Sequence, residues 1–207
     1  MLPAVLAVLL ALVSWQVAVA GPLLGLDRRI RDGVQHAREV WHSVPLNDLG
    51  QLLSDLGDPL PAYAVLLGTA ALAACRSRRA GRRRWWLPLP SALLAAVLIP
   101  LLVVPAKDYF SRPGPLGPPL LPGQQGWYPS GHTSTAGIAF GVAALLLGRT
   151  LAAAARRRLA ALTALLCCGV GLGLVWCDYH WFLDVLAGWS LTGLVLWSLA
   201  RWLPRPR

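Results

Sequence analysis

The sequence predicts an all-α integral membrane protein, built as a bundle of six transmembrane helices. Hydrophobic side chains make up 56% of the 207 residues and charged ones only 14%, and the mean hydropathy is +0.55. Soluble domains are less apolar and carry more charge than this. Apolar stretches also recur six times at close to the 20 or so residues that a helix needs to cross the hydrocarbon core. We therefore expect a single membrane domain over residues 1–207.

The six predicted spans alternate with polar loops. They are Leu2–Ala20, Leu60–Cys75, Trp85–Ala106, Thr133–Ala155, Leu159–Trp176 and Val185–Trp202. The second is short and contains Pro61, so we expect it to take residues from the segment before it. Arg149 lies within about two turns of the end of the fourth, where a long side chain reaches the interface. The core of the bundle is expected at about residues 60–202.

The first span, within residues 1–20, ends in Ala18-Val19-Ala20-Gly21, which is similar to a signal-peptidase site. No basic residue precedes the apolar run as one does in a signal peptide, so we expect a retained anchor. Cleavage is the alternative, and it leaves the remaining topology unchanged.

Residues 21–59 are expected to form an amphipathic connector at the outer membrane surface. Acids and bases alternate over Asp27–Glu39, and Asn47 is a possible helix cap. Four leucines follow it at helical spacing: Leu49, Leu52, Leu53 and Leu56. Amphipathic segments of this kind lie in the interface plane. A simple solvated connector is the alternative. Further on, proline and glycine exclude a regular helix over Pro113–Gly126 and predict a shaped loop.

The net charge of +10 comes almost entirely from arginine. A basic total also occurs in nucleic-acid-binding proteins, so the distribution of charge has to decide. Thirteen arginines and no acid fall in residues 76–84, 149–158 and 201–207, whereas all nine acids lie in the alternate loops. By the positive-inside rule, the arginine loops and both termini face the cytoplasm, in a plasma or inner membrane. We therefore expect no nucleic-acid partner.

Cysteines and tryptophans add little chemistry of their own. The four cysteines show no metal-ligand spacing, and Cys167-Cys168 lies in an apolar run, so we expect neither a metal site nor a disulfide. The ten tryptophans lie mainly at span ends, where an aromatic belt explains them. For Trp127 and Trp181, which flank the two polar blocks described next, lining a lipid entrance is the alternative.

The block Pro129-Ser130-Gly131-His132 precedes an apolar span and therefore predicts a helix N-terminus. Free backbone N–H groups at such an end bind anions. Ser130 adds a hydroxyl donor, Gly131 lets the backbone approach a phosphoryl oxygen, and His132 can act as a general acid. A serine- and threonine-rich helix cap with an interfacial histidine is the alternative.

His180 and Asp184 lie four positions apart and so share one face of a helix. A carboxylate that bonds one imidazole nitrogen leaves the other free to attack phosphorus. An isolated pair with this spacing is more often a helix-surface contact. The Pro-Ser-Gly-His block upstream, separated from it by one span out and one back, favours the catalytic interpretation.

Together with Lys107, these blocks resemble the type 2 phosphatidic acid phosphatase superfamily, the lipid phosphate phosphatases. Its members carry a Lys–Arg-Pro block, a Pro-Ser-Gly-His block and an Arg–His–Asp block. The resemblance implies hydrolysis of a lipid phosphate without metal or cofactor, through a phosphohistidine. It makes His180 the nucleophile, His132 the general acid and Asp184 the partner of His180. It places Lys107, Ser130 and Gly131 on the phosphate.

Two arginines of the family pattern are missing. Their positions are occupied by Gly114 and Leu174. Arg112 is the nearest substitute, and we expect it to hold the phosphate, since a guanidinium binds two oxygens at once. Asp178 brings an extra negative charge close to His180. Arginines of the first outer loop are the alternative source of charge: Arg28, Arg29, Arg31 and Arg38.

Three functions follow from these blocks. The favoured one is an outer-face lipid phosphatase acting on a polyprenyl or glycerolipid phosphate. A non-catalytic relative that binds a lipid headgroup or a partner is the alternative, because the two arginines are missing. A vanadate-dependent haloperoxidase shares the three blocks, but those enzymes are typically soluble and six spans argue against it.

Overall fold

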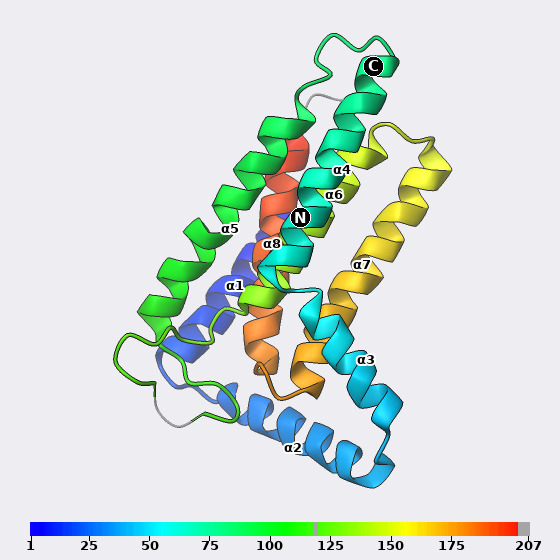
Figure 1. Cartoon of the computed structure of the whole chain (residues 1–207). Helices are drawn as coiled ribbons and strands as arrows, with labels where there is room; N and C mark the ends of the chain where they lie inside the picture. Colours follow the sequence, from blue (N-terminus) through cyan, green and yellow to red (C-terminus); the bar gives the residue numbers. More distant parts are fainter. Residues whose placement is uncertain (118–119, 203–207) are drawn as a thin grey trace.

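The structure, a computed structural model, describes residues 1–117 and 120–202 and is all-helical over those ranges. Figure 1 shows the long helices side by side, with one helix crossing an end of the bundle. In chain order the helices are α1 (Leu2–Ala18), α2 (Leu24–Trp41), α3 (Val44–Asp55), α4 (Pro59–Arg79), α5 (Pro88–Phe110), α6 (Gly131–Gly148), α7 (Ala153–Trp176) and α8 (Phe182–Trp202).

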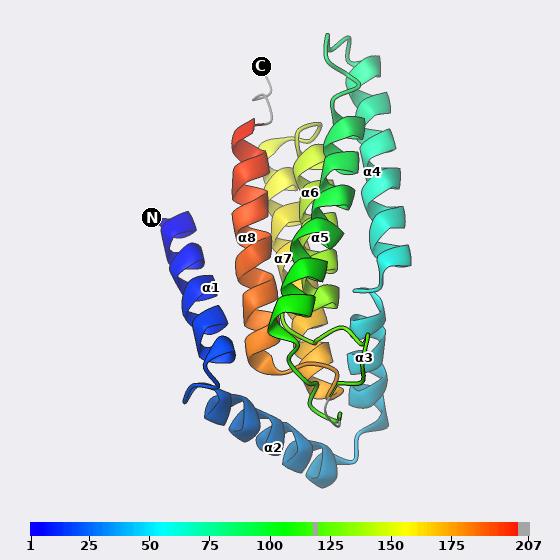
Figure 2. The same cartoon turned by 90° about the vertical axis from the view of Figure 1, so that its left-hand side faces the viewer.

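Five of the predicted spans, α4 to α8, are helices long and apolar enough to cross a membrane. The all-α membrane fold is therefore confirmed. The helix α1 is apolar but has 17 residues, so the sixth span stays a prediction. Figure 2 shows α1 alongside α8, with the N-terminus part-way along the bundle.

The helix ends differ from the predicted ones for identifiable reasons. The second span takes only one residue, Pro59, from the preceding segment. It begins at Pro59 and extends at its other end to Arg79, because Pro59 and Pro61 occupy the first turn, where the helix needs no amide hydrogens. The helix α6 stops at Gly148, so Arg149 lies outside the span that was expected to contain it.

The centre of the bundle is α6, which packs against α4, α5, α7 and α8. Small residues allow this close packing, as they do in other membrane helices. A Cβ on Gly137 would lie 2.4 Å from the Thr192 hydroxyl, and one on Gly141 would lie 2.5 Å from Leu196. Nearer the other end, a Cβ on Gly188 would lie 2.9 Å from the Cβ of Thr133, so the N-terminus of α6 is held against the N-terminal half of α8, which positions the two polar blocks.

The connector folds into two helices that pack on the bundle. Ile30 and Val34 of α2 contact the core, and α3 lies along α7. Asn47 is not the cap of α3. Ser43 is the cap, with its Oγ accepting from the Leu46 N–H, while Asn47 accepts a hydrogen bond from the Trp176 indole at 3.0 Å.

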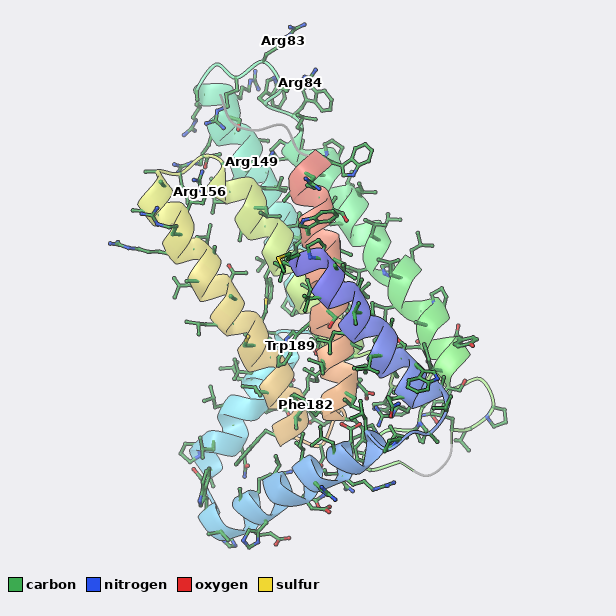
Figure 3. All side chains as sticks on the ribbon, turned by 180° about the vertical axis from the view of Figure 1, so that it is seen from behind. Arg83, Arg84, Arg149, Arg156, Phe182 and Trp189 are labelled. Atoms are coloured by element: carbon green, nitrogen blue, oxygen red, sulfur yellow. The ribbon has the colours of Figure 1, made fainter. Side chains whose placement is uncertain are left out.

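Charge divides the molecule into two ends. Figure 3 shows Arg83, Arg84, Arg149 and Arg156 at one end, and Phe182, the first residue of α8, near α2 at the other. Five of the nine acids lie in α2 and α3 at this second end. The other four are at helix ends or in a loop there: Asp58 before α4, Asp108 at the end of α5, Asp178 between α7 and α8, and Asp184 at the start of α8. The predicted site residues lie at the same end.

Candidate active site

The three sequence blocks meet at the acidic end of the bundle. Lys107 is in the last turn of α5, His132 in the first turn of α6 and His180 just before α8. The two imidazole rings face each other edge to face, with centroids 6.3 Å apart and planes inclined at 63°. The two imidazoles are therefore neighbours, as an acid and a nucleophile that act on one group must be.

The N-terminus of α6 is held by a network of backbone and side-chain bonds. Ser130 is its N-cap: the Oγ accepts from the Thr133 N–H at 3.2 Å, and the Ser130 N–H donates to the Asp184 carbonyl at 3.0 Å. Lys107 crosses this end, donating from Nζ to the Gly126 carbonyl at 2.8 Å. A Cβ on Gly131 would lie 3.3 Å from Cε of Lys107, so glycine lets the ammonium group lie against the helix start.

His180 and Asp184 form a buried pair. Nδ1 of His180 lies 3.2 Å from Oδ2 of Asp184. Burial lowers the pKa of His180 below its usual value, an effect that the hydrogen bond and charge of Asp184 oppose and that Lys107 and His132 reinforce. The imidazole is therefore held neutral, with its N–H toward the carboxylate and its Nε2 lone pair available.

Asp184 is bound on its other side by an arginine that the sequence assigned elsewhere. Nη1 of Arg112 donates to Oδ1 of Asp184 at 2.5 Å, and Nη2 donates to Asp27 at 2.6 Å. The guanidinium is thus buried between two carboxylates. The expectation that Arg112 holds phosphate stays a prediction, and this geometry favours another task, holding Asp184 in place.

Asp27 is a site residue that sequence reasoning missed. Its Oδ1 accepts from the Leu183 N–H at 2.9 Å, so α2 caps the start of α8. Burial raises the pKa of Asp27 and Arg112 opposes this. A signal was available: Asp27 is three and seven positions before Ile30 and Val34, which places a carboxylate on the buried face of α2.

Asp58 is the second missed residue. Its Oδ1 lies 2.9 Å from Nε2 of His132. A Cβ on the preceding Gly57 would lie 2.7 Å from the His132 Cβ, so a glycine is required where α4 begins. The sequence signal, a Gly-Asp-Pro turn before a span, indicates a helix start but not which histidine it meets.

The structure explains why the two family arginines are missing. A Cβ on Gly114 would lie 2.6 Å from the Trp127 indole. Leu174 is fully buried in the hydrophobic core, and a Cβ on its neighbour Gly173 would lie 2.7 Å from the Gly50 carbonyl of α3. The Trp127 indole therefore fills the space that a side chain at position 114 would need, and position 174 lies in the apolar core, where an unpaired charge is costly.

The extra charge of Asp178 is neutralised by α2. Arg31 lies 3.0 Å from its carboxylate and Arg38 lies 3.4 Å away. These two arginines therefore pair with Asp178.

Arg28 has a different position. It lines an open cavity of about 320 Å³ with Phe110, Arg112 and Trp181, beside the buried network.

Comparison with known proteins agrees with the family resemblance. A sequence model of the PAP2 superfamily matches residues 85–207. The fold matches the crystal structure of the first transmembrane PAP2 type phosphatidylglycerolphosphate phosphatase from Bacillus subtilis. The TM-score is 0.76 at 22% identity, over 96% of this chain and 94% of that one. No curated protein sequence matches the chain.

Proposed function

Because the chain belongs to the PAP2 superfamily, we propose that it is a membrane phosphatase that hydrolyses the phosphate monoester or pyrophosphate of a lipid. The observation that carries this proposal is the pair of facing imidazoles, His132 and His180, with Lys107 and the α6 N-terminus beside them. A polyprenyl or glycerolipid phosphate is the substrate class.

The first step transfers the phosphoryl group to His180. The Nε2 lone pair attacks phosphorus, an N–P bond forms, and the bond from phosphorus to the lipid oxygen breaks. His132 delivers a proton to that oxygen. Since Nε2 of His132 faces Asp58, its other ring nitrogen is the one left to donate.

The second step releases inorganic phosphate. Water attacks phosphorus, His132 takes the proton from the water, and the N–P bond breaks to restore the Nε2 lone pair. Charge on the phosphoryl oxygens is met by Lys107 and by the free N–H groups of α6. No step requires a metal ion.

Arg112 and Asp27 position the nucleophile through Asp184 and do not contact it themselves. Because Asp184 touches Arg112 with one oxygen and His180 with the other, a fixed guanidinium fixes the carboxylate and hence the imidazole. Asp27 holds the guanidinium from α2. The surface helix is therefore a positioning element of the reaction.

Phosphate release in detergent, with a chelator present, tests the proposal on polyprenyl, diacylglycerol and phosphatidylglycerol phosphates. Wild type is expected to hydrolyse at least one of them and His180→Ala none. Mass spectrometry is expected to find acid-labile phosphate on the peptide that contains His180. Activity that persists in His180→Ala overturns the mechanism. Wild-type protein that binds these lipids but hydrolyses none of them supports a non-catalytic relative.

The site is proposed to face the outside, because the arginine-rich end fits the positive-inside rule. A cysteine at Ala80, in the first arginine loop, tests this in a background without the four native cysteines. It is expected to react with an impermeant thiol reagent only after the cells are opened. Labelling of intact cells reverses the orientation.

A further inference from the structure

The end of the bundle opposite the histidines contains a cavity lined by arginines. Arg76 and Arg79 of α4, with Arg82 and Ala80 of the following loop and Thr150 after α6, surround an open space of about 440 Å³. Nη1 of Arg82 donates to the Arg149 carbonyl at 3.1 Å. This bond ties the α4–α5 loop to the α6–α7 loop beside the cavity.

The positive charge of this cavity is not paired with an acid within the part of the chain that the structure describes. The sequence has no acid between Asp58 and Asp108, between Asp108 and Asp178, or after Asp184. Within residues 1–117 and 120–202, Arg76, Arg79 and Arg82 form no salt bridge. Three guanidinium groups around one hollow repel each other unless an anion lies between them.

Other arginines at this end have different partners. Arg78 stacks over Trp85 with 5.2 Å from its Cζ to the ring centroid, and Arg201 stacks over Trp197 at 4.8 Å. Tryptophans at span ends mark the headgroup level of a bilayer. The cavity lies at the same end as Trp85, so it meets lipid phosphates rather than bulk solvent alone.

We propose that this cavity binds the phosphate of an anionic phospholipid headgroup in the leaflet opposite the active site. Arginine binds phosphate oxygens in bidentate fashion, and basic pockets between membrane helices on the cytoplasmic side take such headgroups. The bound phosphate would join the end of α4 to the end of α6. These two helices carry Asp58 and His132 at their other ends.

The test measures thermal unfolding of delipidated protein in detergent with added phosphatidylglycerol, which has no phosphomonoester and is therefore not a substrate of the proposed reaction. Phosphatidylcholine and inorganic phosphate are the comparison ligands. The cavity variant is Arg76→Gln/Arg79→Gln/Arg82→Gln. The control Arg83→Gln/Arg157→Gln/Arg158→Gln removes the same charge from arginines that do not line the cavity, and Figure 3 shows Arg83 directed away from the bundle.

Phosphatidylglycerol is expected to raise the unfolding midpoint of wild type and control. The cavity variant should need about tenfold more lipid for the same shift, through loss of charge-assisted bonds. An equal loss in the two variants overturns the site in favour of diffuse surface charge. An equal shift with inorganic phosphate assigns the cavity to a free anion and overturns the lipid proposal.

Two controls separate the result from folding and from catalysis. If the triple variant does not fold, Arg79→Gln alone is measured, and it is expected to weaken lipid stabilisation more than Arg157→Gln. His180→Ala is expected to retain the full stabilisation, because the cavity is at the other end of the bundle. Loss of stabilisation in His180→Ala would place the lipid at the active site and overturn the proposal.

Discussion

The two histidines of the site each face a carboxylate, but one pair is buried and the other is exposed. The side chains of His180 and Asp184 are 5% and 0% exposed, and they are four residues apart at the start of one helix. Those of His132 and Asp58 are 41% and 52% exposed, and they come from two helices. Burial therefore separates two pairs with the same chemical groups.

This difference matches the two tasks of the proposed reaction. Inside a protein, a charge contact is stronger than in water and its geometry is fixed, which suits a nucleophile that needs one tautomer. Near the surface the contact is weaker, but water reaches the imidazole. An acid that gives up a proton and takes one from water in each cycle needs such access.

The largest effect is expected from the buried pair. Asp184→Asn should lower kcat by about 10⁴-fold, as does the loss of the carboxylate in a Ser-His-Asp triad, because the tautomer of His180 is no longer fixed. The measurement is phosphate release together with the yield of phosphohistidine. A loss below tenfold would show that Asp184 does not orient the nucleophile.

Arg112 sharpens the comparison, because the buried pair has it as a third member and the exposed pair has no counterpart. Arg112→Ala leaves Asp27 and Asp184 buried without a cation, which should cost about 3–5 kcal/mol of stability and about 100-fold in kcat. Arg112→Lys should recover part of the stability but little of kcat.

Separate measurement of kcat and KM distinguishes the two roles of Arg112. A positioning role lowers kcat and leaves KM and the inhibition constant of inorganic phosphate unchanged. A phosphate clamp, the role expected from the sequence, raises both constants. Asp27→Asn is the matched variant, because it touches the network only through Arg112 and the start of α8. It should follow the kcat pattern of Arg112→Lys.

The sequence predicted those parts of the molecule that have local patterns. Apolar runs predicted the five long helices, and Lys107, His132 and His180 were placed in advance at one end of the bundle. His180 and Asp184 were predicted as a pair because helical spacing alone joins them. The general family followed from these blocks, since each block is contiguous.

The contacts that depend on packing between distant segments were missed. Asp27 and Arg112 are 85 residues apart, and Asp58 and His132 are 74 apart, so no spacing rule connects them. From the family pattern, the only role that could be predicted for Arg112 was binding phosphate. Its burial between two carboxylates follows from how α2 crosses the bundle, which hydrophobic patterning does not determine.

A smaller effect is expected at the exposed pair. Asp58→Asn should lower kcat by about tenfold, less than the roughly 10²–10⁴-fold that acid–base catalysis contributes as a whole, because His132 remains and water can still exchange with it. In the first step, measured as the rate of phosphohistidine formation, the loss should vanish with a p-nitrophenyl phosphate substrate, whose leaving group needs no proton. Asp55→Asn is the control, since that carboxylate is also exposed and bonds Gln51 instead. Equal losses with both substrates would make Asp58 a structural residue.

The smallest effect is a shift of the acid limb of the pH profile. Burial holds the pKa of His180 below 6.5, so the nucleophile stays neutral as pH falls and is lost only when pH passes through the lowered pKa. Lys107 also lowers this pKa and Asp184 raises it. Lys107→Gln should therefore move the acid limb of phosphohistidine formation to higher pH, and Asp184→Asn should move it to lower pH. The measurement is the rate of phosphohistidine formation against pH, with each variant scaled to its own maximum. Shifts in the same direction for both variants would show that a group other than His180 controls the limb.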